Sequence, residues 1–165
     1  MDKAERKALI EKYGRAYGDF VAGLKEVPKE MWQFKPAPKE WSVHEVIVHL
    51  ADSETNSYLR ARRLIAEPGQ PLMAYDQDVW ANKLDYHNQS TEDALEVLKG
   101  VRKMTYDLIK RLPDEIWANT VEHPEYDEPY SFEKWLGIYA NHPYVHLGQV
   151  QENYRLWKEQ QKKAA

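Results

Sequence analysis

The chain contains no cysteine. This absence excludes disulfide bonds, thiolate metal ligands and cysteine nucleophiles. Any metal site must therefore be built from histidine, aspartate, glutamate or backbone oxygen. Any reaction at a thiol would need its sulfur from a co-substrate.

The sequence also lacks a long apolar run and an excess of basic residues. No segment approaches the roughly 20 apolar residues of a membrane-spanning helix, and Met1–Arg6 lacks the apolar stretch of a signal peptide. The formal net charge is -4 and the isoelectric point is about 5.9, so no basic surface for nucleic acid or anionic lipid is expected. These features predict a cytoplasmic protein that binds neither nucleic acid nor membrane.

The 165 residues fit a single domain, 1–165, that is long enough to bury a core. Apolar residues recur at helical spacing in four long segments, which predicts an all-α fold. Ser42 and Glu45 have the spacing of a capping box at the start of the second segment. The four helices are predicted from about Lys3 to Leu24, from Ser42 to about Ala66, from Ser90 or Thr91 to before Pro113, and from Ser131 to roughly Lys158.

The connections between these helices are long. Pro71–Gln89 is predicted to carry a short helix around Asp76–Tyr86, and Trp117–Tyr130 is rich in Pro, Asp and Glu and is expected to be an irregular loop. Pro143 falls inside the fourth helix. It lacks a backbone N–H, so we expect it to kink that helix or loosen one turn.

A weak internal repeat relates the two halves of the chain. Leu24–Trp32 resembles Ile109–Trp117, and Val48-His49-Leu50 is echoed by Val145-His146-Leu147. Two helix–linker–helix halves related by a pseudo-two-fold axis would place the second and fourth helices together. His49 would then face His146 across the bundle.

His142 and His146 are four residues apart on the predicted fourth helix. Their side chains therefore share one face, a spacing that suits two imidazoles on one metal ion. With six histidines in the chain, such a pair also arises by chance, and hydrogen-bonded structural histidines are the alternative interpretation. The repeat brings His49 into range and favours a three-histidine site.

The remaining histidines and acids give weaker signals. His44 precedes His49 by five residues and is expected to point elsewhere, whereas His87 and His123 fall in predicted loops and are expected to be solvated. Asp52 lies one turn beyond His49 and is the best candidate for proton transfer, ahead of Glu54 and Asn56. The alternative for Asp52 is an exposed helix acid.

Two motifs resemble those of the DinB/YfiT-like metalloenzyme family. Trp41–Glu54 (WSVHEVIVHLADSE) is similar to the family's first histidine motif, and His142–Gln149 (HPYVHLGQ) is similar to its second, H-x-x-x-H followed by Gln. The resemblance covers nearly the whole chain in order and spacing. It implies a four-helix up-down-down-up bundle, three histidine metal ligands at His49, His142 and His146, and a homodimer. Pro143, directly after one of these ligands, departs from an undistorted helix.

The resemblance also implies a class of function. Some family members are enzymes that use low-molecular-weight thiols, so we expect a divalent-metal-dependent S-transferase or hydrolase acting on a small molecule. Zinc is the first choice of metal and nickel the second, since three nitrogen ligands suit both. Two alternatives remain open: a non-catalytic metal- or small-molecule-binding stress protein, and a helical interaction module. The sequence does not identify the substrate.

Overall fold

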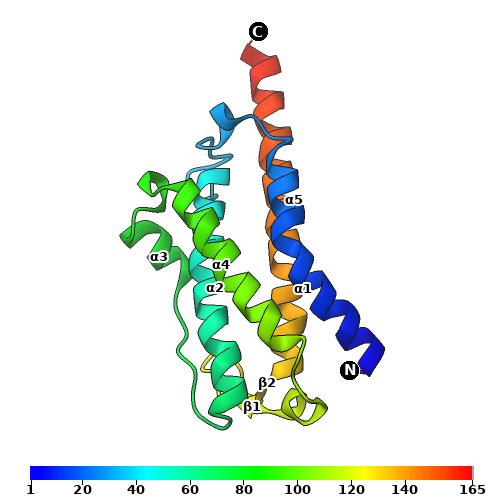
Figure 1. The fold of residues 1–165 in the computed structure, drawn as a ribbon. Helices are drawn as coiled ribbons and strands as arrows, with labels where there is room; N and C mark the ends of the chain where they lie inside the picture. Colours follow the sequence, from blue (N-terminus) through cyan, green and yellow to red (C-terminus); the bar gives the residue numbers. More distant parts are fainter. Residues whose placement is uncertain (165) are drawn as a thin grey trace.

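The computed structural model describes residues 1–164, and their side chains through residue 163. Four long helices dominate it (Figure 1). They are α1 (Lys3–Leu24), α2 (Val43–Ala66), α4 (Thr91–Ile109) and α5 (Phe132–Ala164). The smaller elements are α3 (Gln77–Lys83), strands β1 (Thr120–Val121) and β2 (Tyr130–Ser131), and 3-10 turns at Lys29–Met31, Tyr86–Asn88 and Asp114–Ala118.

The long helices form an up-down-down-up bundle, as predicted. The chain rises along α1, descends along α2, returns through a long connection to descend again along α4, and rises along α5 (Figure 1). Helix α1 packs on α5 and α2 on α4, while α1–α4 and α2–α5 contacts close the ring. The second and fourth long helices are therefore neighbours, as the repeat predicted.

Local capping signals set the register of the two helices that carry the histidines. At the start of α2, the backbone N–H of Glu45 donates to Ser42 Oγ at 3.2 Å, and that of Ser42 donates to Glu45 Oε2 at 2.8 Å. Before α5, Ser131 Oγ accepts from the Lys134 N–H at 3.1 Å. The predicted capping box of Ser42 and Glu45 is confirmed, and the Ser131 side chain caps α5. Each cap satisfies donors that a helix start would leave unpaired.

The structure corrects three expectations about the second half. The segment Trp117–Tyr130 is not wholly irregular, because β1 pairs with β2 in the antiparallel register Thr120↔Ser131 and Val121↔Tyr130. Helix α5 continues to Ala164 rather than ending near Lys158, since its tail is rich in good helix formers. Pro143 lies inside α5, which is a single uninterrupted helix, so the loosened turn, one of the two expected effects, is not seen.

Two apolar clusters fill the bundle, one around Val46, Ile47 and Leu50 of α2 and the other around Trp135, Leu136 and Ala140 of α5. Within residues 1–164, none of the helices combines the length and apolar character needed to cross a lipid bilayer. The buried polar residues that separate these clusters include His49, Ser53 and Glu54.

Candidate metal centre

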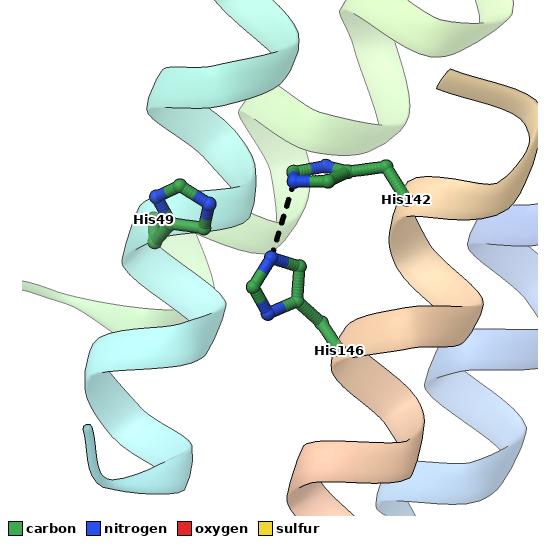
Figure 2. Close-up of side chains that lie close together, drawn as sticks. All are labelled: His49, His142 and His146. Atoms are coloured by element: carbon green, nitrogen blue, oxygen red, sulfur yellow. Dashed lines mark hydrogen bonds between the residues drawn. The ribbon is translucent and has the colours of Figure 1, made fainter. Parts of the chain in front are cut away.

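Three histidines converge between α2 and α5. His49 comes from α2, whereas His142 and His146 come from successive turns of α5 (Figure 2). One ring nitrogen from each lies within 4.8 Å of the others. The structure thus brings together all three residues predicted from the spacing and the repeat.

Helix geometry explains how the two α5 histidines meet. Residues four apart lie one above the other on one helix face, and the Nε2 atoms of His142 and His146 are 3.1 Å apart. The rings of His49 and His146 approach from the facing helices with centroids 4.8 Å apart. The three rings surround a common point rather than stacking on one another (Figure 2).

The hydrogen bonds of His146 define its proton position. Its Nδ1 lies 3.0 Å from Gln149 Oε1. An amide oxygen can only accept, so Nδ1 carries the proton, and the lone pair of Nε2 is directed at the cluster, where it is hydrogen-bonded to His142 Nε2 (Figure 2). Gln149 therefore orients His146 in the way that hydrogen-bonding partners orient metal-binding imidazoles.

His49, unlike His146, has no hydrogen bond that orients its ring within the described residues. Its side chain is 1% exposed, and neither ring nitrogen has a hydrogen-bond partner among the described residues. His142 Nδ1 is also buried without a partner there. Buried polar atoms without partners are costly and rare, and a metal ion at the cluster would satisfy one of the two His49 nitrogens.

Burial sets the protonation state of the cluster. It lowers the pKa of His49 to about 3, with a smaller contribution from His146. It also lowers the pKa of His142 well below the usual value, helped by the two neighbouring histidines, and lowers that of His146. The imidazoles are thus neutral at physiological pH, which is the form that binds metal.

The donor set fits a divalent transition metal. Three imidazoles provide borderline nitrogen ligands and leave one or more positions open, the pattern of a catalytic rather than a closed structural site. Trp41 covers one side, with its ring 4.6 Å from that of His49 and stacked at 6.5 Å from that of His146. The indole therefore restricts the directions from which a ligand can enter.

Two hollows lie beside the three histidines. The larger, of about 670 Å³, is lined by Ser53, one turn beyond His49, and by Tyr139, one turn before His142, together with Arg60, Tyr75, Gln77 and Glu125. The smaller, of about 210 Å³, is lined by His146, Gln149 and Trp41 and shares Gln77 with the first. Small molecules therefore have space on the side of the cluster that Gln77 borders.

None of the predicted acids belongs to the group of potential metal ligands formed by the three histidines. Asp52 is half-buried, and its Oδ2 accepts a hydrogen bond from Tyr86 Oη at 2.5 Å. Burial, followed by this contact, raises the pKa of the Tyr86 phenol. Asn56 donates to the backbone of its own helix, at the carbonyl of Asp52. Glu54 is fully buried and ion-paired with Arg102 at 2.5 Å, so it belongs to the core rather than to the cluster.

The other histidines lie outside the cluster, as expected. His44 Nε2 contacts the carbonyl of Gln89 at 2.7 Å, and its ring faces that of His87. The expectation for His123 was wrong in one respect, because this residue is 4% exposed rather than solvated. It packs against Tyr126 and Tyr130, and its Nδ1 accepts from the Glu125 N–H.

Sequence reasoning missed Arg102, which is 3% exposed at the centre of the bundle. Its guanidinium donates to Glu54, to the carbonyl of Tyr13 and to that of Tyr139. The available signal was a charged residue on the apolar face of α4, between Leu98 and Thr105, which are both buried. A charge in that position needs a buried partner.

Comparisons with known proteins identify relatives that are named as metal-dependent hydrolases. A protein of Oceanobacillus iheyensis with the name "Putative metal-dependent hydrolase" is 36% identical over 110 residues, which are 67% of this chain and 63% of that protein. YfiT of Bacillus subtilis, also described as a "Putative metal-dependent hydrolase", is 29% identical over 112 residues, which are 68% of this chain and 63% of YfiT. The matched segment thus spans less than two thirds of either relative.

A solved structure extends the comparison to the fold. YfiT from Bacillus subtilis, described as having an unusual four-helix bundle topology, superposes with a TM-score of 0.86 at 22% identity, covering 94% of this chain and 89% of that one. The sequence model of the DinB superfamily matches residues 12–150, a range that contains all three clustered histidines. The chain therefore belongs to the DinB superfamily.

Proposed function

We propose that this protein is a divalent-metal-dependent enzyme whose ion is held by His49, His142 and His146. The observation that carries the proposal is the convergence of three neutral imidazoles within 4.8 Å, with both nitrogens of buried His49 lacking another partner. The names of the relatives from Oceanobacillus and Bacillus point to the same class. Zinc is the first candidate and nickel the second.

A divalent ion with open positions lowers the pKa of a water or thiol bound to it and polarises an electrophilic substrate. The protein's own residues provide the setting for this chemistry. Gln149 keeps the His146 proton on Nδ1, and Trp41 covers one side of the cluster. Gln77, Ser53 and Tyr139 border the space in which a substrate would lie.

The proposed reaction is hydrolysis or transfer to a low-molecular-weight thiol. In the thiol reaction a carbon–sulfur bond forms as the bond to the leaving group breaks, and the thiol proton passes to a base. Asp52 is our candidate for that base. The chain has no cysteine, so the sulfur has to come from the co-substrate.

Elemental analysis of the purified protein tests the metal site. We expect close to one divalent ion per chain, and almost none in His49→Ala, His142→Ala and His146→Ala. His44→Ala, on the same helix as His49 but outside the cluster, is the matched control and should retain the ion. Full retention of metal by His49→Ala would overturn the site.

Turnover assays then test the enzyme class. The metal-loaded protein should convert a member of a panel of electrophilic substrates with water or a thiol, and removal of the ion by a chelator should abolish that activity. A loaded protein that is inert across the panel would instead favour a non-catalytic metal-binding role.

A further inference from the structure

Arg60 of α2 is a cation without an ion pair at the wall of the larger cavity. Its Nη1 donates to Tyr139 Oη at 3.0 Å and its Nη2 to the carbonyl of Met73 at 3.2 Å. Among residues 1–164, no carboxylate lies within the 4.0 Å of a salt bridge. Its Nε is buried and has no hydrogen-bond partner in the described part of the chain. A buried donor of a charged group that lacks an acceptor is costly.

The cavity places this guanidinium near residues that adjoin the histidine cluster. Arg60 and Tyr139 both line it, and the Tyr139 ring packs against that of His142 with centroids 5.9 Å apart. Ser53, one turn beyond His49, lines the same space. A ligand anchored at Arg60 can therefore extend through this cavity toward the cluster, past Gln77, which also lines the smaller hollow at His146.

The other two charged residues that line the cavity, Asp76 and Glu125, are acidic, and neither forms a salt bridge with Arg60. Asp76 uses Oδ1 to accept from the N–H groups of Asp78 and Val79 at the start of α3. Glu125 lies exposed on its loop. Arg60 is the single cation among the cavity-lining residues. Its planar group matches the geometry of a carboxylate.

The length of the ligand follows from helix geometry. His49 and Arg60 are eleven residues apart on α2, a rise of about 16 Å. Helical side chains at both positions lean toward the N-terminus, so only the greater length of the Arg60 side chain shortens this gap, by a few ångströms. A molecule that reaches both ends has to be extended.

We propose that Arg60 binds the carboxylate of an extended small-molecule acid whose reactive group lies at the histidine cluster. This inference rests on the proposed metal site and names the substrate class of that site. The carboxylate would accept from the second hydrogens of Nη1 and Nη2, while Tyr139 and the Met73 carbonyl, which accept the first ones, hold the guanidinium in place.

Matched thiols on the cobalt-loaded protein test the inference. A thiolate bound to Co²⁺ gives a charge-transfer absorption, so its affinity can be measured without turnover. We compare a six-carbon mercapto acid with the mercapto alcohol of the same length, and a three-carbon acid–alcohol pair that is too short to reach Arg60. The six-carbon acid should bind at least about tenfold tighter than its alcohol, and the short pair should bind equally.

Two variants assign the effect to Arg60. In Arg60→Met the six-carbon acid and alcohol should bind equally, with cobalt stoichiometry unchanged. Arg63→Met is the matched control, because Arg63 also donates to a loop carbonyl, that of Pro71, but does not line this cavity. It should keep the tenfold preference.

The possible failures are distinguishable. Equal binding of the six-carbon pair to the wild-type protein, with a clear thiolate absorption, would overturn the role of Arg60 and leave the metal site intact. The same preference in the short pair, or its persistence in Arg60→Met, would also overturn it. A protein that takes up no cobalt would remove the metal site, and this inference with it. The wild-type comparison decides the question even if Arg60→Met fails to fold.

Discussion

Arg102 donates from both Nη atoms to the backbone carbonyl of Tyr139, each at 3.3 Å. Tyr139 lies four residues before Pro143, which has no N–H to satisfy that carbonyl. A guanidinium from α4 thus replaces the missing hydrogen bond of α5, one turn from His142. This contact explains how α5 continues through a buried proline between two clustered histidines.

Replacing Arg102 by Met should destabilise the protein by about 3–5 kcal/mol, because Glu54 would stay buried without its partner. Urea unfolding followed by circular dichroism measures this. The variant Glu54→Leu/Arg102→Met should recover part of the loss, since it removes both charges. Lys103→Met, at an exposed neighbouring position, should unfold like the wild type.

Pro143→Ala should reduce the cost of losing Arg102. Alanine at 143 restores an N–H for the Tyr139 carbonyl, so Arg102→Met should cost about 1 kcal/mol less in that background. A double-mutant cycle measures this coupling. An equal cost in both backgrounds would show that Arg102 acts through Glu54 alone.

Gln149→Leu should weaken metal binding by roughly 10- to 100-fold, because His146 would lose the acceptor that fixes its proton on Nδ1. Competition with a chromophoric chelator measures the affinity. Gln151→Leu is the control, since this residue is exposed on the same helix. Similar affinities in both variants would contradict an orienting role for Gln149.

The metal-free protein should lose stability as the pH falls below about 6.5. Burial lowers the pKa of His49 to about 3, whereas an unfolded histidine titrates near 6.5. The unfolded chain therefore binds more protons between these values, and the stability rises with pH across that window. From pH 6.5 to 5 the loss due to His49 is on the order of 2 kcal/mol. Urea unfolding at several pH values gives the free energy of unfolding as a function of pH. This free energy should depend less steeply on pH in His49→Leu than in the wild type, and an equally steep dependence would refute the role of His49.

Much of the fold follows from local signals in the sequence. Ser42 with Glu45 fixes the start of α2, and Ser131 fixes that of α5. Pro28 and Pro113, which occupy matching positions in the internal repeat, are each followed by a 3-10 turn, at Lys29–Met31 and Asp114–Ala118. The pairing of β1 with β2 could not be predicted in this way, since each strand has two residues and depends on tertiary burial of Val121 and Tyr130.

The candidate site also contains residues that could be predicted from the sequence and residues that could not. The spacing of His142 and His146 follows from the helical repeat, and the internal repeat placed His49 opposite them. Arg60 carries no such signal, because charged residues on helices are usually solvated. The position of Arg102 on the apolar face of α4 indicates a buried charge but does not identify its partner. The roles of both arginines depend on partners distant in the sequence, Glu54 and Tyr139.

Asp52→Asn tests proton transfer at the site. If Asp52 is the base, the variant should lose roughly 10²- to 10⁴-fold in kcat, with metal content and melting temperature close to those of the wild type. Tyr86→Phe removes the hydrogen bond to Asp52 Oδ2 but leaves the carboxylate in place, so it should retain most of the turnover. Steady-state kinetics and thermal unfolding of both variants measure these effects. Equal loss of activity in the two variants, accompanied by lower melting temperatures, would show that Asp52 anchors Tyr86 instead of moving protons.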